Sequence, residues 1–324
     1  MEGKILLNLD TEDDDELTIG CAGGIDVTGS GNYASEAVMD NGKAFKVKIK
    51  GLSGGHSGMD IHKGLGNANK LMNRFLYLLS LAHDLQVASI DGGGLRNAIP
   101  RESVATIVIP AEKEALFLNF TKQYQATLIN EYKTTDPNIE LEFTSTALPE
   151  TVLEDDFLQD ALRTIYSIPN GIYRMSPDIK DLVQTSNNLA RVLIKDGEYK
   201  LMCLCRSSVD SEKMDQAFMI QSAMELLGAQ VDFSGTYPGW TPKPEAKIVS
   251  LMKDLYQEMF DAPAHVAACH AGLECGILGT NYPEVEMISF GPNIRGAHSP
   301  DEKVQISSVQ KYWGFLLETL KRIS

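Results

Sequence analysis

The stretch Lys43-Ala-Phe-Lys-Val-Lys-Ile-Lys-Gly51 alternates apolar and charged side chains. Successive side chains of a strand point to opposite faces, so this alternation predicts a half-buried β-strand. A helix is expected next, because Gly64–His83 carries apolar residues at helical spacing. These two elements begin the unit that decides the fold of the middle of the chain.

Four further elements complete that unit. We predict strands at Gln86–Asp91, Val104–Ile109 and Ile139–Phe143, and a helix at Ala111–Tyr132. The order is then β-α-β-β-α-β, the split unit of ferredoxin-like α+β folds.

A second, less regular half follows. Lys195-Asp-Gly-Glu198 is typical of a tight hairpin turn between two strands. The elements expected in this half are helices at Glu154–Tyr166 and Ser211–Leu227 and strands at Leu182–Ile194, Tyr199–Cys205 and Gln230–Ser234.

The composition changes at Tyr237-Pro-Gly-Trp-Thr-Pro-Lys-Pro244, where prolines and a glycine predict a crossing between domains. Beyond it, an α/β part is too short for an independent domain, so we expect Ile5–Leu9 to supply its first strand. The expected fold class is α/β, with an α/β domain in two segments, residues 1–23 and 236–324, interrupted by an α+β domain at 24–235. The elements of the C-terminal segment are helices at Glu245–Phe260 and Ser307–Ile323 and strands at Ala264–Ala268 and Val285–Phe290.

Composition excludes several classes of partner. The chain has 324 residues and a formal net charge of −15 at pH 7. Nucleic acids and anionic membranes need clustered Lys and Arg, so neither is expected to bind. No apolar run approaches the roughly 20 residues that span a bilayer, and no signal-peptide pattern is found. Five irregularly spaced cysteines predict reduced thiols and a cytoplasmic location.

Two residues far apart in the sequence are candidate metal ligands. Asp10 follows a predicted strand and opens the acidic run that ends at Glu16, and His298 lies on the loop Gly291–Glu302. Carboxylate and neutral imidazole both bind borderline metals such as zinc. The alternatives are a loop or helix-capping carboxylate, a solvated acidic run, and a histidine without a chemical role.

Four other polar residues are candidates for catalysis or substrate binding. His56 lies among the glycines of Gly51–Gly58, which allow close approach of a ligand or another segment. The amide of Asn97 could polarise a carbonyl, Arg206 at a strand end could hold a carboxylate, and Glu274 could bind an amino group. The structural alternatives are an exposed turn histidine, a turn-capping amide, a surface ion pair and a helix cap.

Several short motifs of this chain are informative when they are taken together. They are Asn8-Leu-Asp10-Thr-Glu12, Gly20-Cys-Ala-Gly-Gly-Ile-Asp26, Gly54-Gly-His-Ser-Gly58, Arg96-Asn-Ala-Ile-Pro100, Arg206-Ser-Ser-Val-Asp210, Tyr237-Pro-Gly-Trp240, His270-Ala-Gly-Leu-Glu-Cys-Gly276 and Gly296-Ala-His-Ser-Pro-Asp-Glu302. Together they resemble the bacterial aminoacyl-histidine dipeptidases of the M20 metallopeptidase family, from about residue 3 to residue 323.

The resemblance implies a hydrolase with two zinc ions, in which a metal-activated water attacks the peptide bond of a Xaa-His dipeptide. By this resemblance Asp10 and His298 are zinc ligands, His56 stabilises the oxyanion, Asn97 positions the substrate, and Arg206 holds its free carboxylate. The resemblance also implies that the two-segment α/β domain is the catalytic domain and that the inserted α+β domain is a lid, and a homodimer is compatible with the family.

The family's His-x-Asp motif, its bridging Asp and its Glu-Glu pair have no equivalent in this chain, which resembles the C-terminal two-thirds of a dipeptidase. Those residues supply most metal ligands and the general base. We therefore expect the 324-residue chain by itself to bind zinc weakly and not to hydrolyse peptides. Two alternatives stay open: another M20 peptidase or deacylase, and a non-catalytic lid or dimerisation module.

Overall fold

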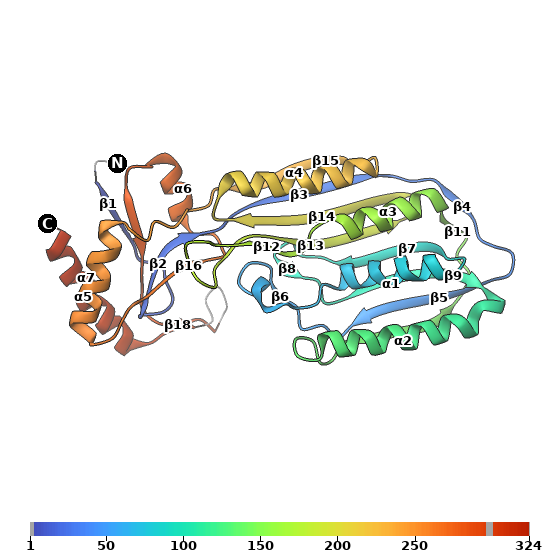
Figure 1. Cartoon of the computed structure of the whole chain (residues 1–324), viewed down its shortest axis with the longest axis horizontal. Helices are drawn as coiled ribbons and strands as arrows, with labels where there is room; N and C mark the ends of the chain where they lie inside the picture. Colours follow the sequence, from blue (N-terminus) through green and yellow to red (C-terminus); the bar gives the residue numbers. More distant parts are fainter. Residues whose placement is uncertain (1–2, 296–300, 324) are drawn as a thin grey trace.

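Two β-sheets lie toward opposite ends of an elongated molecule (Figure 1). The computed structural model describes residues 3–295 and 301–323. A four-stranded sheet lies on the side of the two termini, and a nine-stranded sheet fills the longer part. The larger sheet runs from Gly23 to Tyr237. The division into residues 1–23, 24–235 and 236–324 stays a proposal.

Both terminal segments contribute strands to the smaller sheet. As predicted, the first strand pairs in parallel with a strand near the C-terminus, with Ile5 opposite Glu286. The sheet order is β1-β17-β2-β16. These strands are β1 (Ile5–Asn8), β2 (Glu16–Cys21), β16 (His265–Cys269) and β17 (Glu286–Ser289).

Three helices belong to this smaller part: α5 (Lys247–Phe260), α6 (Glu274–Asn281) and α7 (Ile306–Ile323). The first and last pack with the sheet around a buried apolar cluster, which includes Leu17 and Phe315. Its aromatic rings contact one another, since the Phe290 and Phe315 centroids are 5.6 Å apart.

The first unit of the larger sheet has the predicted β-α-β-β-α-β order. Its sheet order is β10-β5-β9-β7. The elements are β5 (Gly42–Lys50), α1 (Ala68–Ala82), β7 (Gln86–Gly93), β9 (Ser103–Pro110), the short 3-10 helix η2 (Ala111–Lys113), α2 (Glu114–Tyr132) and β10 (Glu140–Thr146).

A second unit has the same order of elements and is interrupted by the first. Its sheet order is β13-β14-β3-β15, so the two units are arranged as mirror-ordered halves of one sheet. Its elements are β3 (Gly23–Asn32), α3 (Asp155–Ser167), β13 (Val183–Lys195), β14 (Glu198–Ser207), α4 (Asp210–Leu226) and β15 (Gln230–Tyr237).

The two units join edge to edge within the chain. Strands β7 and β13 pair antiparallel, with Gly93 opposite Arg191 and Ile90 opposite Ile194. This seam makes the two units one continuous sheet. The ninth strand, β12 (Gly171–Met175), pairs with β13. The edge that each unit would otherwise leave open is therefore covered by the other unit.

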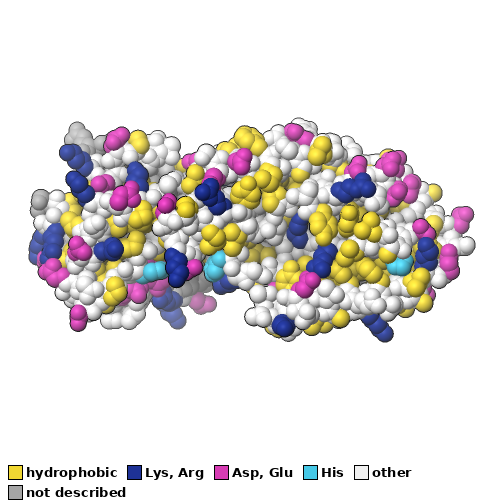
Figure 2. Space-filling view, viewed as in Figure 1, with side chains coloured by type: hydrophobic (Ala, Val, Ile, Leu, Met, Phe, Trp, Pro, Cys, Tyr) yellow, Lys and Arg dark blue, Asp and Glu magenta, His cyan; other side chains and the backbone are white. Residues whose placement is uncertain are grey.

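One face of the larger sheet is buried under helices. The alternation in β5 behaves as predicted: Phe45, Val47 and Ile49 are buried in the core with residues of α1 to α4, and Lys46 is exposed. In Figure 2 the Lys and Arg side chains of the visible face are scattered among acidic ones. No helix within residues 3–295 and 301–323 has the length and apolarity to cross a membrane.

The structure differs from the expectations at some element boundaries. Helix α1 begins at Ala68, not Gly64, because Asn67 caps it by accepting from the backbone N–H of Asn69 at 3.0 Å. Strands β2 and β3 were not predicted. Glycines are poor strand formers, and in β3 a side chain at Gly29 would collide with Met224.

Short pairings complete the described fold. Asp196 and Gly197 in the β13–β14 hairpin both have positive φ, at 56° and 83°, as a two-residue type I′ turn requires. The remaining elements are β4 (Ser35–Ala37) with β11 (Thr151–Leu153), β6 (Gly55–His56) with β8 (Ala98–Ile99), β18 (Ile294–Arg295) with β19 (Lys303–Val304), and the 3-10 helix η1 (Ile61–Lys63).

Candidate active site

His56 lies on a turn that pairs with the loop carrying Asn97. The two-residue strands β6 and β8 pair with His56 opposite Ala98. The Ser57 backbone N–H donates to the Asn97 carbonyl oxygen at 2.8 Å. Two candidates that are 41 positions apart by number are therefore held side by side by backbone hydrogen bonds.

The backbone also determines which nitrogen of His56 carries the proton. Nδ1 accepts from the N–H groups of Met59 at 3.0 Å and Gly58 at 3.2 Å. The proton of the neutral ring therefore lies on Nε2, which is free to act as a donor. Burial and the Arg206 charge lower the pKa of His56, while the Asp60 charge opposes them. At neutral pH the ring is an uncharged hydrogen-bond donor.

Arg206 is a buried cation at the end of β14. It is 5% exposed, its Nη1 donates to the Tyr237 hydroxyl at 2.7 Å, and its Nε has no partner. No carboxylate of residues 3–295 or 301–323 forms an ion pair with it. An unpaired buried charge costs on the order of several kcal/mol. Such a site is suited to an anionic ligand, and a guanidinium binds carboxylates through two donors.

His270 joins the smaller part of the molecule to the larger sheet. It lies after β16, and its Nε2 is 2.7 Å from the Ser186 hydroxyl oxygen on β13. Burial, followed by the Arg206 charge, lowers the pKa of His270 to about 3. A side chain at Gly58 would collide with the His270 carbonyl oxygen and lie 3.1 Å from the His56 ring. The two histidines are therefore neighbours.

The Asn97 loop comes from the first unit but is fastened to the second. Asn97 is exposed, while the preceding Arg96 forms an ion pair with the buried Asp26 of β3. Asn188 of β13 donates to the carbonyl oxygens of Arg96 at 3.2 Å and Ala98 at 2.8 Å. The exposed amide is thus presented from an anchored turn.

The site is composite. The first unit supplies His56 and Asn97, the second supplies Arg206, and the smaller part supplies His270. Histidine and basic side chains also gather where the two parts meet in Figure 2. The arrangement can hold an anion at Arg206 while the Nε2–H group of His56 donates to an adjacent oxygen.

Comparison with known proteins agrees with this geometry. The chain is 42% identical over 323 residues to the cytosol non-specific dipeptidase of Escherichia coli (strain K12), covering 100% of this chain and 67% of the relative. The chain belongs to the M20 family of dipeptidases. A profile described as the peptidase dimerisation domain of M20 proteins matches residues 47–136, within the first unit of the larger sheet.

The M20 fold is also shown by a solved structure. The aminoacylhistidine dipeptidase of Vibrio alginolyticus superposes with a TM-score of 0.96 at 38% identity, over 99% of this chain and 66% of that chain. The family resemblance and the fold class expected from the sequence are therefore confirmed. The chain spans about two-thirds of the length of these relatives. The relatives are dipeptidases, hydrolases of peptide bonds.

M20 membership implies a metal cofactor, and the candidate ligands were Asp10 and His298. Asp10 is exposed just after β1, and the pKa of Cys275 is raised mainly by burial, with a small contribution from the Asp10 charge. His298 lies outside the described residues. Residues 3–295 and 301–323 contain no group of three or more His, Cys, Asp or Glu side chains that could hold a metal ion. The described residues alone therefore do not fit a complete zinc site.

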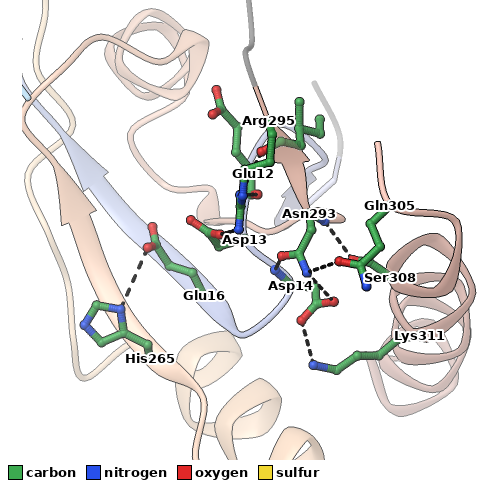
Figure 3. Close-up of polar contacts among 11 residues, drawn as sticks. Glu12, Asp13, Asp14, Glu16, His265, Asn293, Arg295, Gln305, Ser308 and Lys311 are labelled. Atoms are coloured by element: carbon green, nitrogen blue, oxygen red, sulfur yellow. Dashed lines mark hydrogen bonds and ion pairs between the residues drawn. The ribbon is translucent and has the colours of Figure 1, made fainter. Parts of the chain in front are cut away.

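Figure 3 shows the acidic run after Asp10 in contact with the segment that carries Asn293 and Arg295 and with helix α7. Asp13 pairs with Arg295 at 2.7 Å, and Asp14 pairs with Lys311 at 2.8 Å. Burial favours a higher pKa for Asp14, but bonds and charges of Lys311 and its neighbours outweigh it, so the pKa is lowered. Asp13 and Asp14 are thus paired with cations, while Glu12 and Asp15 of the same run are exposed.

Glu274 and the cysteines have simpler environments. Glu274 is exposed in the first turn of α6, where the N-cap residue is Leu273, so the carboxylate is not the cap. All five cysteines are free thiols, as their number and irregular spacing predicted. Burial raises the pKa of Cys203 and of Cys269 to about 12, so these thiols are poor nucleophiles.

Sequence reasoning missed three residues of the site. Ser186 and Asn188 lie in the predicted strand Leu182–Ile194, to which no chemical role was assigned, and His270 was quoted only within a motif of the resemblance. The signal for His270 was its motif, His270-Ala-Gly-Leu-Glu-Cys-Gly276, which carried part of the resemblance. Ser186 and Asn188 had no separate signal.

Proposed function

We propose that this chain forms the substrate-binding lid and part of the catalytic domain of a zinc-dependent dipeptidase for Xaa-His substrates. The observation that carries the proposal is Arg206, a buried guanidinium without a carboxylate partner, beside the neutral donor His56. The names of the two relatives, a non-specific dipeptidase and an aminoacylhistidine dipeptidase, support the same reaction.

Each residue has a distinct role in the proposal. Arg206 binds the free carboxylate of the dipeptide, which offsets the cost of the buried charge. His56 donates from Nε2 to the carbonyl oxygen of the scissile bond, where negative charge develops during attack. Asn97 positions the substrate with its amide, and Glu274 binds near the amino end.

The proposal places the lid contacts in one chain. His56 and Arg206 come from two units that pair through β7 and β13 of the same polypeptide. A homodimer, which the dimerisation profile suggests as an option, would therefore use a surface other than this seam. We also propose a cytoplasmic location, supported by the cytosolic relative and the free thiols.

For the metal, we propose zinc with Asp10 and His298 among its ligands. Bound zinc lowers the pKa of a coordinated water and polarises a carbonyl. Because the described residues bring together no three candidate ligands, we propose that the 324-residue polypeptide alone binds zinc weakly and does not turn over dipeptides. Turnover of Ala-His at an ordinary enzymatic rate by the purified chain with zinc would contradict this.

The substrate proposal is tested by calorimetry of the 324-residue chain with Ala-His, with its C-terminal amide and with an N-acetylated amino acid. The free dipeptide should bind more tightly than its amide, and Arg206→Met should abolish that preference. Equal affinity for acid and amide would overturn the role of Arg206. Preference for the N-acetylated amino acid would favour a deacylase of the same family instead.

A further inference from the structure

Four strands align one row of residues across the larger sheet. Ser186 of β13 is opposite Arg206 of β14, Arg206 is opposite Gly24 of β3, and Gly24 is opposite Tyr237 of β15. Directly opposed residues point to the same face of a sheet. Arg206 and Tyr237 therefore share a face, with one glycine between them.

The glycine allows the tyrosine to reach across its neighbouring strand. A Cβ atom on Gly24 would lie 2.7 Å from atoms of the Tyr237 ring, and a Cβ on Gly272 would lie 3.0 Å from it. A contact of 2.7 Å between a Cβ and a rigid ring is not tolerated, and one of 3.0 Å is tight. The ring is therefore seated between two positions that both lack side chains, one in each part of the molecule.

A bulge turns Tyr237 into this row. The register of β15 against β3 shifts between Ser234 and Tyr237, and Gly235 has φ +56°. A shift of this kind re-aims the side chains that follow it. The strand end is thus shaped so that the phenol, and not a neighbouring side chain, contacts Arg206.

The hydroxyl of Tyr237 has an unused proton. It accepts from Arg206 Nη1 at 2.7 Å, and within the described parts of the chain it donates to no acceptor. A phenol that accepts from a cation is polarised toward donating its own proton. A carboxylate at Arg206 would accept a hydrogen bond from that hydroxyl. The NH₂ group of a carboxamide carries only donors, so it cannot accept from Tyr237 or from Arg206.

We infer that Tyr237 contacts the substrate as the second donor of the Arg206 carboxylate site, and thereby selects dipeptides that have a free C-terminal carboxylate. The inference rests on the proposed function, because it concerns the same ligand. It adds a residue from the motif Tyr237-Pro-Gly-Trp240, for which the sequence suggested only a crossing between domains.

Calorimetric titration of the 324-residue chain with Ala-His and with Ala-His amide tests this inference. Tyr237→Phe should weaken binding of the acid by about tenfold, the equivalent of one hydrogen bond to a charged group, and leave the amide unchanged. Gly24→Ala should do the same, because its methyl group displaces the ring. Tyr33→Phe, at the other end of the lid, is the matched control and should change neither affinity.

The outcomes separate the two proposals. If the unaltered chain prefers the acid and Tyr237→Phe keeps that preference, the inference is wrong and the role of Arg206 stands. Equal weakening of acid and amide would mean that Tyr237 is only structural and would also overturn the inference. If the unaltered chain binds neither ligand, or shows no preference, the proposed function fails, and the inference fails with it.

Discussion

Asn188→Ala should destabilise the chain by releasing the loop that presents Asn97. Asn188 is 1% exposed, and its Nδ2 donates to the carbonyl oxygens of Arg96 at 3.2 Å and Ala98 at 2.8 Å. Its Oδ1 accepts from Asn67 at 3.3 Å. One side chain thus connects both units of the lid at the site.

The magnitude follows from the bonds that are lost. Each neutral hydrogen bond contributes about 1 kcal/mol, and polar groups left buried without a partner add to the loss. Two good bonds and one long bond give an expected decrease of about 2–3 kcal/mol in the free energy of unfolding. At roughly 2–4 °C per kcal/mol for a protein of this size, the melting temperature should fall by about 4–12 °C.

Thermal unfolding followed by circular dichroism measures the stability, and amide hydrogen exchange measures the loop. Exchange at residues 95–99 should accelerate in Asn188→Ala, because the anchored turn opens more readily. Asn138→Ala is the control, since Asn138 is exposed. If the two variants melt at the same temperature, or if exchange at residues 95–99 is unchanged, the anchoring role of Asn188 is refuted.

Three other predictions follow from the fold and the charges. Cysteines at positions 91 and 193, which oppose each other across the seam, should form a disulfide within one chain that migrates as a monomer without reductant, while covalent dimers would refute the intrachain seam. His270 has a pKa of about 3 in the folded state and an ordinary value near 6.5 when unfolded, so the unfolded state binds more protons between these values. Stability should therefore fall as the pH drops below about 6.5, by about 2 kcal/mol at pH 5, and urea titrations should show that His270→Asn lacks this part of the pH dependence. The lowered pKa of Asp14 means that its pair with Lys311 stabilises the fold above the ordinary carboxyl pKa and is lost as the pH falls below it. Asp14→Asn should then be less stable than the unaltered chain at pH 7, with a difference that shrinks as the pH falls below the ordinary carboxyl pKa, and a difference that does not change with pH would contradict the ion pair as its cause.

Much of the lid was predictable because its signals are local. Alternation in β5 and the Asp196-Gly197 turn depend on neighbours in sequence, and the first unit follows in its chain order. The second unit was only partly seen. Its first strand, β3, is separated from α3 by the whole first unit. The glycines of β3 are typical of a loop, and the packing of Met224 against Gly29 exists only in the folded structure.

The candidate site was also predictable only in its local features. Residue type and setting were sufficient to select His56 and Arg206, since an imidazole among glycines and an arginine at a strand end are unusual. Their chemical states were not predictable. The tautomer of His56 depends on the N–H of Met59, and the unpaired charge of Arg206 depends on which side chains surround it after folding.

By itself, the sequence determined the family, the order of elements in the first lid unit and the residue types of the site, because these depend on motifs and on local periodicity. Only the tertiary structure decided that the two units pair within one chain, that His270 lies beside His56, and that Tyr237 reaches Arg206 over Gly24. Those relations join residues from distant segments, and strand register and side-chain packing create them only when the sheet is assembled.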